Sequence, residues 1–341
     1  MPLTSAAIAA EEIAQSPAWL PLETARETAR ETARDPRTVR LVRLDEVGYR
    51  AASFLDQRLL AANPPTATVA AATVAAAAAR LTPGAHYIFH IGHVGSTLVS
   101  RLVGEFEGLF SVREPVALRE AASHVTDLRG TLGLLARTWR PGQRAVVKAT
   151  SFVSELAESI MESDPHAAAI MMFTPAPAYL RCILGGPNSR TESRALGPAR
   201  LARLRRRLGE GASGTDPQSE GQWIAMSWLC EMICLQQAAR RFASRVLWVD
   251  FDEFLAAPRA GLEAIVGALG ATAHPHDLQA IVGGPIMHRY SKAPEHAYDA
   301  ALRQDVLAFA EREHLAEIRR GMAWLEALGA RQPAAAEALQ R

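Results

Sequence analysis

Short apolar runs alternate with longer, helix-like segments over most of the chain from residue 86 onward. Four such runs occupy 87–91, 145–147, 168–173 and 246–249. Apolar runs of this length, separated by helical segments, are typical of the buried strands of a parallel sheet with helices on both faces. The pattern therefore predicts an α/β fold built on a mostly parallel sheet.

The first 83 residues follow a different pattern. Three copies of Glu-Thr-Ala-Arg fill 23–34 and place opposite charges three and four residues apart, which predicts a solvated helix. Residues 39–44 alternate apolar side chains with arginine, as an edge strand or extended arm does. Residues 45–60 and 66–79 are predicted to be helical, the latter leading into the first strand. The extension is therefore predicted to be mainly helical.

Residues 190–241 interrupt the strand pattern a second time. They combine an arginine-rich stretch with an apolar segment that begins at a capping box of Ser219 and Gln222. Because no aromatic side chains interleave with the arginines, a solvated helix explains them better than a nucleic-acid site. We interpret 190–241 as a helical insertion or lid over the strand ends. The predicted organisation is an N-terminal helical extension, 1–83, followed by an α/β domain, 84–330, that contains this insertion.

Composition narrows the classes of function. Of 341 residues, 49% are hydrophobic and 21% are charged, which suits a folded domain, and the formal net charge of +1 provides no overall field for nucleic acid or an anionic membrane. No apolar run is long enough for a membrane span, and the N-terminus does not look like a signal peptide, so we expect a cytoplasmic protein. No motif specifies an oligomeric state.

The three cysteines are not site candidates. They are too few for a disulfide framework and lack metal-ligand spacing. Cys230 and Cys234 lie one helical turn apart among apolar residues, which favours core packing over redox chemistry. A reducing compartment is consistent with this usage.

The loop IGHVGSTL, residues 91–98, is the strongest chemical signal. Its two glycines permit backbone conformations that turn amide hydrogens inward, and a helix opens on Ser96 and Thr97. This geometry suits a phosphate, although such a turn can also be purely structural. The lysine that nucleoside triphosphatases require before the serine is missing. Because LWVD at 247–250 is similar to the magnesium-holding strand of those enzymes, a metal-dependent phosphotransferase stays an alternative.

Together with two later segments, the loop resembles the sulfotransferase family. IGHVGSTL is similar to the family's 5′-phosphosulfate loop, VKATSF at 147–152 to a segment of its bacterial and Golgi-type members, and VLWVDFDEFLAAP at 246–258 to a third. The resemblance implies a P-loop-type sheet and transfer of a sulfuryl group from 3′-phosphoadenosine 5′-phosphosulfate to a hydroxyl or amine. It implies a small-molecule or peptide acceptor and no obligatory metal. The loop residues implied to hold the donor are Gly92, Gly95, Ser96, Thr97 and Leu98.

Three residues are the candidates for catalysis. His93 stands where the family usually has arginine or lysine, and it either contacts the phosphosulfate or packs over the loop. Glu114 is placed like the catalytic glutamate of tyrosylprotein-type members, so it is either the general base or a salt-bridge partner of Arg113 or Arg119. Lys148, one of only two lysines in the chain, follows an apolar strand directly. It either contacts the sulfonate or phosphate or forms a structural ion pair.

The residues for the donor's 3′-phosphate depart from the family's pattern. The family's Arg and Asp are absent after the third apolar run, and Arg181 stands about where its serine would be. Ser189 and Arg190 follow a glycine-rich turn that could aim them at an anion, and Lys292 either covers the nucleotide or lies in a solvated turn. Either these residues and the arginine-rich stretch bind the 3′-phosphate in place of the missing Arg and Asp, or the protein does not use the usual donor. A divergent binding module on the same fold is thus a second hypothesis.

Overall fold

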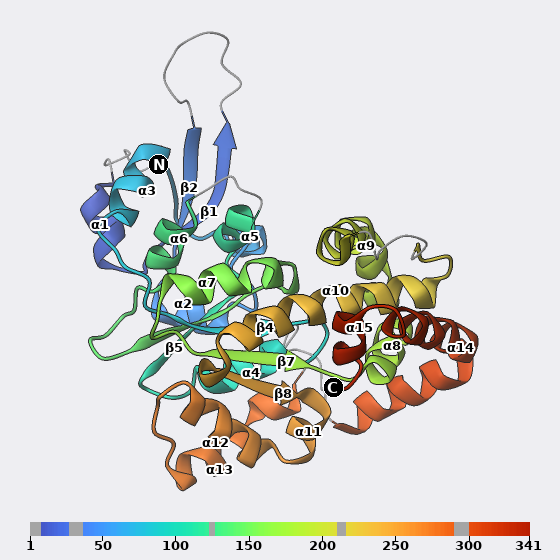
Figure 1. The fold of residues 1–341 in the computed structure, drawn as a ribbon. Coiled ribbons are helices and arrows are strands. Elements are labelled where there is room, and N and C mark those ends of the chain that lie inside the picture. Colours follow the sequence, from blue (N-terminus) through green and yellow to red (C-terminus); the bar gives the residue numbers. More distant parts are fainter. Residues whose placement is uncertain (1–7, 27–36, 123–126, 210–215, 290–299) are drawn as a thin grey trace.

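A computed structural model describes residues 8–26, 37–122, 127–209, 216–289 and 300–341. Within these ranges the centre of the molecule is a five-stranded parallel sheet (Figure 1). Its strands are β4 (His86–His90), β5 (Leu109–Arg113), β6 (Arg144–Lys148), β7 (Ala169–Phe173) and β8 (Val246–Asp250), in the order β5-β6-β4-β7-β8. The predicted α/β fold with a mostly parallel sheet is therefore confirmed.

Strands β4, β5 and β7 are buried at every residue, which explains why β4 and β7 appear in the sequence as mainly apolar runs. The sequence did not predict β5, because Ser111 and Arg113 interrupt its apolar pattern. Both polar side chains are satisfied internally: the Ser111 hydroxyl lies 2.7 Å from that of Ser100, and Arg113 binds backbone carbonyls.

Helices cover both faces of the sheet. α4 (Ser96–Val103) and α12 (Pro258–Ala268) pack on one face, and α7 (Ala157–Ser163) and α10 (Glu220–Arg241) pack on the other (Figure 1). The remaining helices of this part are α5 (Val116–Ala122), α6 (Leu128–Leu135), η2 (Ser151–Leu156), α8 (Ala176–Leu184), α9 (Pro187–Leu208), η4 (Ala243–Arg245), α11 (Phe251–Ala256), α13 (Pro275–Val282), η5 (Pro285–His288), α14 (Ala300–Gly329) and α15 (Pro333–Ala338). None of the described helices is both long and apolar enough to cross a membrane.

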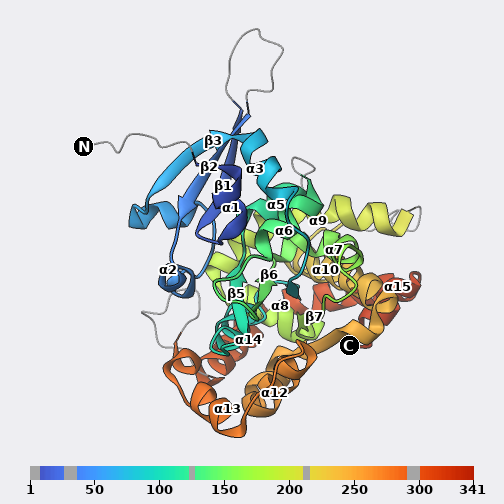
Figure 2. The ribbon, with the colours of Figure 1, turned by 90° about the vertical axis from the view of Figure 1, so that its left-hand side faces the viewer.

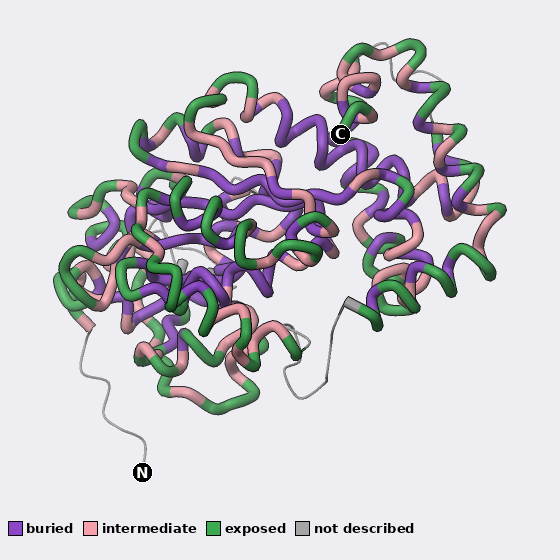
Figure 3. The backbone as a smooth tube through the Cα atoms, turned by 90° about the horizontal axis from the view of Figure 1, so that it is seen from below, coloured by how far each residue is buried: buried purple, intermediate pink, exposed green. Residues whose placement is uncertain are grey.

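The predicted insertion at 190–241 is helical, but its two halves differ. α10 contributes Trp228, Leu229 and other fully buried residues to the same hydrophobic core as the sheet, and Cys230 and Cys234 are buried there as expected. Figure 3 shows buried segments, in purple, running through the middle of the molecule. α10 is therefore a core helix rather than a lid. For α9 a position over the strand ends stays a prediction.

The N-terminal extension contains a sheet as well as helices. β1 (Trp19–Arg26), β2 (Arg37–Arg43) and β3 (Thr66–Ala70) pair antiparallel in that order, with α1 (Ala10–Gln15) and α3 (Ala71–Ala78) beside them (Figure 2). α2 (Glu46–Ala51) and η1 (Gln57–Ala62) connect β2 to β3. The prediction of a mainly helical extension is therefore wrong for these three strands.

The predicted helix over 23–34 is wrong for residues 23–26, which pair with β2, and 27–36 lie outside the described residues. Charge pairs on a helix surface contribute only a few tenths of a kcal/mol each, less than pairing with an apolar strand. Residues 39–44 lie mainly in β2, which is the middle strand and not an edge. Residues 66–79 split into β3 and α3 because Thr66, Thr68 and Val69 favour a strand.

The order of the strands marks one place for a ligand. β4 lies in the centre, and the chain continues from it first to β5 and β6 on one side and later to β7 and β8 on the other. In open parallel sheets, ligands bind at the carboxyl ends of the strands where the order reverses. The loop that follows β4 lies at this point.

Candidate functional site

The loop between β4 and α4 follows a backbone course that side chains rarely adopt. Gly92, His93 and Gly95 have φ of 91°, 56° and 63°. A Cβ on Gly95 would lie 1.9 Å from the Phe251 ring, so only glycine fits there. Gly95 is the N-cap of α4, whose first-turn amides have no acceptors within the helix. Loop and helix start together form a site suited to an anion.

Thr97 gives a second, independent sign of a ligand. Its side chain is 3% exposed, and its Oγ1 has no hydrogen-bond partner within the described residues. The Oγ1 of Thr150, just beyond β6, is likewise without a partner there. A buried hydroxyl in this state costs free energy unless a ligand or water satisfies it. Both threonines line one cavity.

This cavity has a volume of about 1010 Å³ and lies over the carboxyl ends of β4, β5 and β6. Every loop residue from Gly92 to Leu98 lines it, as do Glu114, Ser189 and Phe251. The structure thus brings together the five predicted donor-loop residues, the predicted base Glu114, and His93.

Glu114 and Lys148 form a buried ion pair. The side chain of Lys148 is fully buried and that of Glu114 is 11% exposed. Glu114 has φ of 48°, and its amide donates to the Lys148 carbonyl oxygen over 2.7 Å. A left-handed glutamate persists only where its surroundings enforce it. Of the two residues only Glu114 lines the cavity, and the buried Lys148 ammonium binds its carboxylate.

His93 connects the loop to α9. Its Nδ1 lies 3.2 Å from the Ser189 hydroxyl, and its Nε2 lies 3.3 Å from a carboxylate oxygen of Glu192. Ser189 and His93 both line the cavity. The Glu192 carboxylate therefore lies beside the imidazole ring of His93.

The other residues expected at the 3′-phosphate are held elsewhere. Arg190 donates to both carboxylate oxygens of Glu220 over 3.0 and 2.6 Å, and Arg181 lies 3.8 Å from Glu311. Neither arginine lines the cavity. Lys292 lies outside the described residues.

Arg303 is a site residue that the sequence did not indicate. It is 4% exposed, lines the cavity, and its guanidinium carbon lies 4.8 Å from the centroid of the Phe251 ring. It donates to Asp252 over 2.7 and 3.2 Å. Burial alone would raise the pKa of the Asp252 carboxyl, but this pairing with Arg303 holds that pKa below its usual range. No motif marks α14, which lies beyond the segments that resemble sulfotransferases.

The carboxylates of the VLWVD segment have structural partners. Asp250 caps α11 by accepting from the Asp252 and Glu253 amides over 2.7 and 3.4 Å. Asp252 accepts from Arg303 and from the Thr174 hydroxyl, the latter over 2.8 Å. Neither acid lines the cavity.

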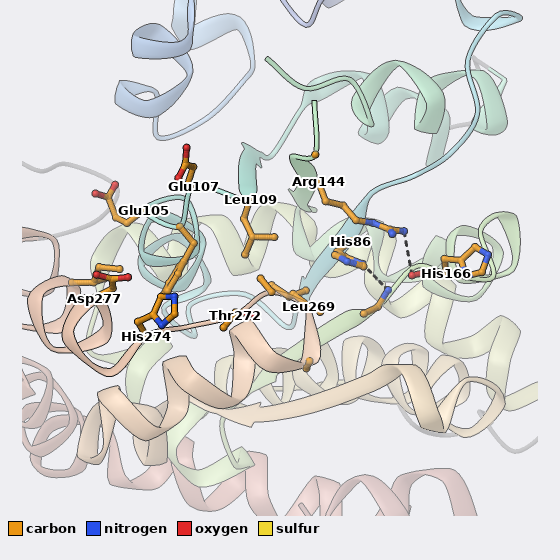
Figure 4. Close-up of a pocket in the computed structure, with 18 residues that line it drawn as sticks. His86, Glu105, Glu107, Leu109, Arg144, His166, Leu269, Thr272, His274 and Asp277 are labelled. Carbon is orange, nitrogen blue, oxygen red and sulfur yellow. Dashed lines mark hydrogen bonds between the residues drawn. The ribbon is translucent and has the colours of Figure 1, made fainter. Parts of the chain in front are cut away.

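A second cavity of about 830 Å³ lies at the opposite, amino ends of the strands (Figure 4). Its lining includes His86, Leu109 and Arg144, which begin β4, β5 and β6. Burial, with the neighbouring Arg144, lowers the pKa of His86 to about 4, and its Nδ1 accepts from the Ala168 amide over 2.9 Å. Since ligands of parallel sheets bind at the carboxyl ends, the first cavity is the candidate site.

Comparison with known proteins returns a likeness at the level of solved structures. No protein-family model and no curated protein matches the chain. Similar structures include a sulfotransferase domain from the curacin biosynthetic pathway, with 13% identity, 72% of this chain and 98% of that chain covered, and a TM-score of 0.40. Mouse sulfotransferase SULT7A1 complexed with PAP is 10% identical, with 76% of this chain and 89% of that chain covered and a TM-score of 0.44. A sulfotransferase domain from the Synechococcus PCC 7002 olefin synthase is 15% identical, with 72% of this chain and 95% of that chain covered and a TM-score of 0.41.

All three are sulfotransferases, the family that the sequence motifs resemble. At these identities and scores the likeness concerns the fold only. The function is therefore inferred from this chain's own site residues.

Proposed function

We propose that the chain transfers a sulfuryl group from 3′-phosphoadenosine 5′-phosphosulfate to a hydroxyl or amine of a small-molecule or peptide acceptor. One observation carries this proposal: the unpartnered Thr97 hydroxyl and the Glu114 carboxylate line the same cavity, at the switch point of the sheet. The Thr97 hydroxyl supplies a hydrogen-bond donor for a phosphate, and the Glu114 carboxylate supplies a general base. A cytoplasmic location belongs to the proposal, and the three free thiols are consistent with it.

The residues present fit the 5′ end of such a donor. The first-turn amides of α4 have no acceptor within their helix, and the Thr97 hydroxyl has no partner among the described residues, so both can donate to a phosphate. At the other end, Arg181 and Arg190 do not line the cavity, so we assign the cation on that side to Arg303, which does. When bound, the donor supplies the sulfuryl group and a nucleotide leaving group.

This chain's residues have separate roles in that reaction. Glu114 accepts the proton of the acceptor's hydroxyl or amine, which general-base catalysis requires to happen at hydrogen-bond distance. Lys148 is a positioning residue that fixes the Glu114 carboxylate. Backbone amides at the positive end of α4 stabilise the negative charge that develops on the leaving phosphate.

A metal-dependent phosphotransferase is the weaker alternative. Its pattern needs a lysine before Ser96 and a carboxylate at the phosphate site, and this chain has no lysine there, while neither Asp250 nor Asp252 lines the cavity. That alternative requires nucleotide affinity to depend on magnesium.

Calorimetric titration with adenosine 3′,5′-bisphosphate tests the proposal. Wild-type protein should bind it equally with and without magnesium. Thr97→Val should weaken binding about tenfold, because a hydrogen bond to a charged group is lost. Its melting temperature should be unchanged or higher, since the hydroxyl has no partner in the part of the chain that the structure describes.

Thr131→Val is the matched control, because Thr131 is buried on α6 away from the cavity lining. Its nucleotide affinity should equal that of the wild type. Wild-type protein that binds no bisphosphate, or Thr97→Val with full affinity, contradicts the proposed function. A strict magnesium requirement favours the phosphotransferase.

A further inference from the structure

A segment of the N-terminal extension forms the far wall of the cavity. The Leu55 amide donates to the Arg113 carbonyl over 2.8 Å, and the Val116 amide donates to the Leu55 carbonyl over 3.0 Å. Leu55 therefore runs alongside Glu114 as a further strand would. Its neighbours Phe54 and Asp56 line the cavity, together with Arg58.

The sheet order fixes where this wall lies relative to the loop. The carboxyl ends of β4, β6 and β5 follow one another, carrying first the loop, then Thr150, then Glu114. Segment 54–58 comes next, beyond β5. A donor bound at the loop thus leaves the space between Glu114 and this segment for the acceptor.

Two arginines converge on one buried carboxylate in this wall. Asp56 is 5% exposed, and the Nε of Arg58 donates to its two oxygens over 2.8 and 3.1 Å. Arg119, on α5, lies 3.9 Å from the same carboxylate and also lines the cavity. Although burial alone would raise it, these arginines hold the pKa of Asp56 below its usual range. Two guanidinium groups and one carboxylate thus lie together in this wall.

Arg58 is pre-oriented and keeps donors for a second partner. Its guanidinium carbon lies 3.4 Å from the centroid of the Phe54 ring, which holds the fork flat. Only its Nε and Nη2 bind Asp56, and a guanidinium has five N–H groups. Its side chain is 57% exposed, so the remaining donors face solvent or a ligand.

We propose that Arg58 and Arg119 bind an oxyanion, carboxylate or phosphate, carried by the acceptor. The acceptor is then a hydroxyl or amine compound with an anionic group on an apolar skeleton, because Phe54, Phe152 and Leu196 line the intervening walls. This inference rests on the proposed function for the acceptor's role, but the oxyanion site can be tested apart from it.

Three small phenols serve as probes: 4-hydroxybenzoate, 4-hydroxybenzylphosphonate and the neutral 4-hydroxybenzyl alcohol. Their binding to the full chain is measured by ligand-observed NMR, with and without adenosine 3′,5′-bisphosphate. The anionic probes should bind about tenfold more tightly than the alcohol, the ratio expected for a charge-assisted hydrogen bond. Which of the two anions binds better identifies the acceptor's group.

In Arg58→Gln/Arg119→Gln the preference for the anionic probes should disappear. Because this variant leaves Asp56 buried beside neutral partners, Asp56→Asn/Arg58→Gln/Arg119→Gln is measured as well, since it removes that unpaired charge. Arg259→Gln, an exposed position on α12, should keep the preference. Equal binding of all probes, no binding of any, or a preference that survives in both variants overturns the proposal.

The outcomes separate this inference from the proposed function. Both arginine variants should bind the bisphosphate as the wild type does, because the loop is untouched. Wild-type protein that prefers the anionic probes but binds no bisphosphate removes the sulfotransferase proposal and leaves the oxyanion site. Bisphosphate binding without any preference for the anionic probes removes the oxyanion site and leaves the sulfotransferase proposal.

Discussion

At the scale of single residues, the site combines strain with buried charge. Two of the three non-glycine residues with positive φ in the described ranges, His93 and Glu114, lie in the cavity wall. Such conformations cost roughly 1–3 kcal/mol each and persist at positions where the surroundings over-determine them. For Glu114 the surroundings are the backbone and the ammonium of Lys148. This explains how a carboxylate can be held rigidly at the edge of a largely apolar core.

The Glu114–Lys148 pair should stabilise the fold only as a pair. Lys148→Met leaves the Glu114 carboxylate almost buried without its cation, and we expect a loss of about 3–5 kcal/mol of unfolding free energy. Glu114→Gln/Lys148→Met removes both charges and should recover much of that loss. Urea unfolding of the wild type, both single variants and the double variant measures the coupling. Additive single effects would contradict the pairing.

The sequence revealed the residues of the site that lie in ordered motifs. Glu114 and the loop from Gly92 to Leu98 were predicted, and the structure brings them into one cavity. Arg303 was missed because its role depends on α14 folding back over Phe251, which no local pattern encodes. Arg181 and Arg190 were expected near the donor, but acids on other helices bind them. Which carboxylate each arginine binds depends on the tertiary structure and cannot be predicted from the local sequence.

At the scale of elements, α9 shows how tertiary packing changes the meaning of an arginine-rich helix. The sequence favoured a solvated helix. Arg205 and Arg206 are indeed exposed, but Arg200 and Arg203 are 4% and 3% exposed and bind Glu231, which is fully buried on α10. Three-residue spacing puts this pair on the inner face. The sequence analysis missed this pairing because Glu231 is a single acid within the mainly apolar middle of α10.

Glu155, in η2, should make the anchoring of α9 sensitive to acid. Although burial alone would raise it, hydrogen bonds and charge from Arg203 and Arg207 lower the pKa of Glu155 to about 2. Because this pKa lies below that of the unfolded chain, the ionised group stabilises the fold above about pH 4.5, and the contribution is lost as the pH falls toward 2.

Unfolding free energies of the wild type and Glu155→Gln at pH 6 and near pH 2.5 test this. The wild type should lose about 1–2 kcal/mol more than the variant over this range, after allowance for solvent screening at a partly exposed site. Glu158→Gln, an exposed partner of Arg241 on α7, is the control and should behave as the wild type. Parallel losses in the wild type and Glu155→Gln would show that Glu155 does not anchor α9.

At the scale of the whole molecule, the extension is part of the core. Leu20, Leu22, Val42, Tyr49 and Leu55 belong to the same hydrophobic cluster as the strands of the parallel sheet. The sequence separated 1–83 from 84–330 because the patterns differ, and that boundary stays a prediction. Contacts between distant segments decide whether two patterns make one folding unit, and periodicity within each segment does not report them.

Two buried arginines connect the extension to the α/β part through backbone oxygens. Arg113 donates to the Ala52 and Arg50 carbonyls over 2.8 and 2.9 Å. Arg137, 7% exposed, donates to the Ser16 and Trp19 carbonyls over 2.6 and 3.0 Å and also binds that of Ile13. Each carbonyl is satisfied only while both parts are folded.

Arg137→Gln should therefore destabilise both parts together. Arg137 binds four carbonyls, those of Ile13, Ser16, Trp19 and Leu134, and an amide offers only two N–H groups, so at least two carbonyls lose their donor, at about 1 kcal/mol each. Hydrogen exchange followed by mass spectrometry should show an equal fall in protection for the slowest amides of β1–β3 and of β4–β7. Arg129→Gln, at an exposed position on α6, the helix that ends shortly before Arg137, should leave both unchanged. If only β1–β3 lost protection, the extension would unfold on its own, and the wall of the cavity at Phe54 and Arg58 would open while the anion loop stayed intact.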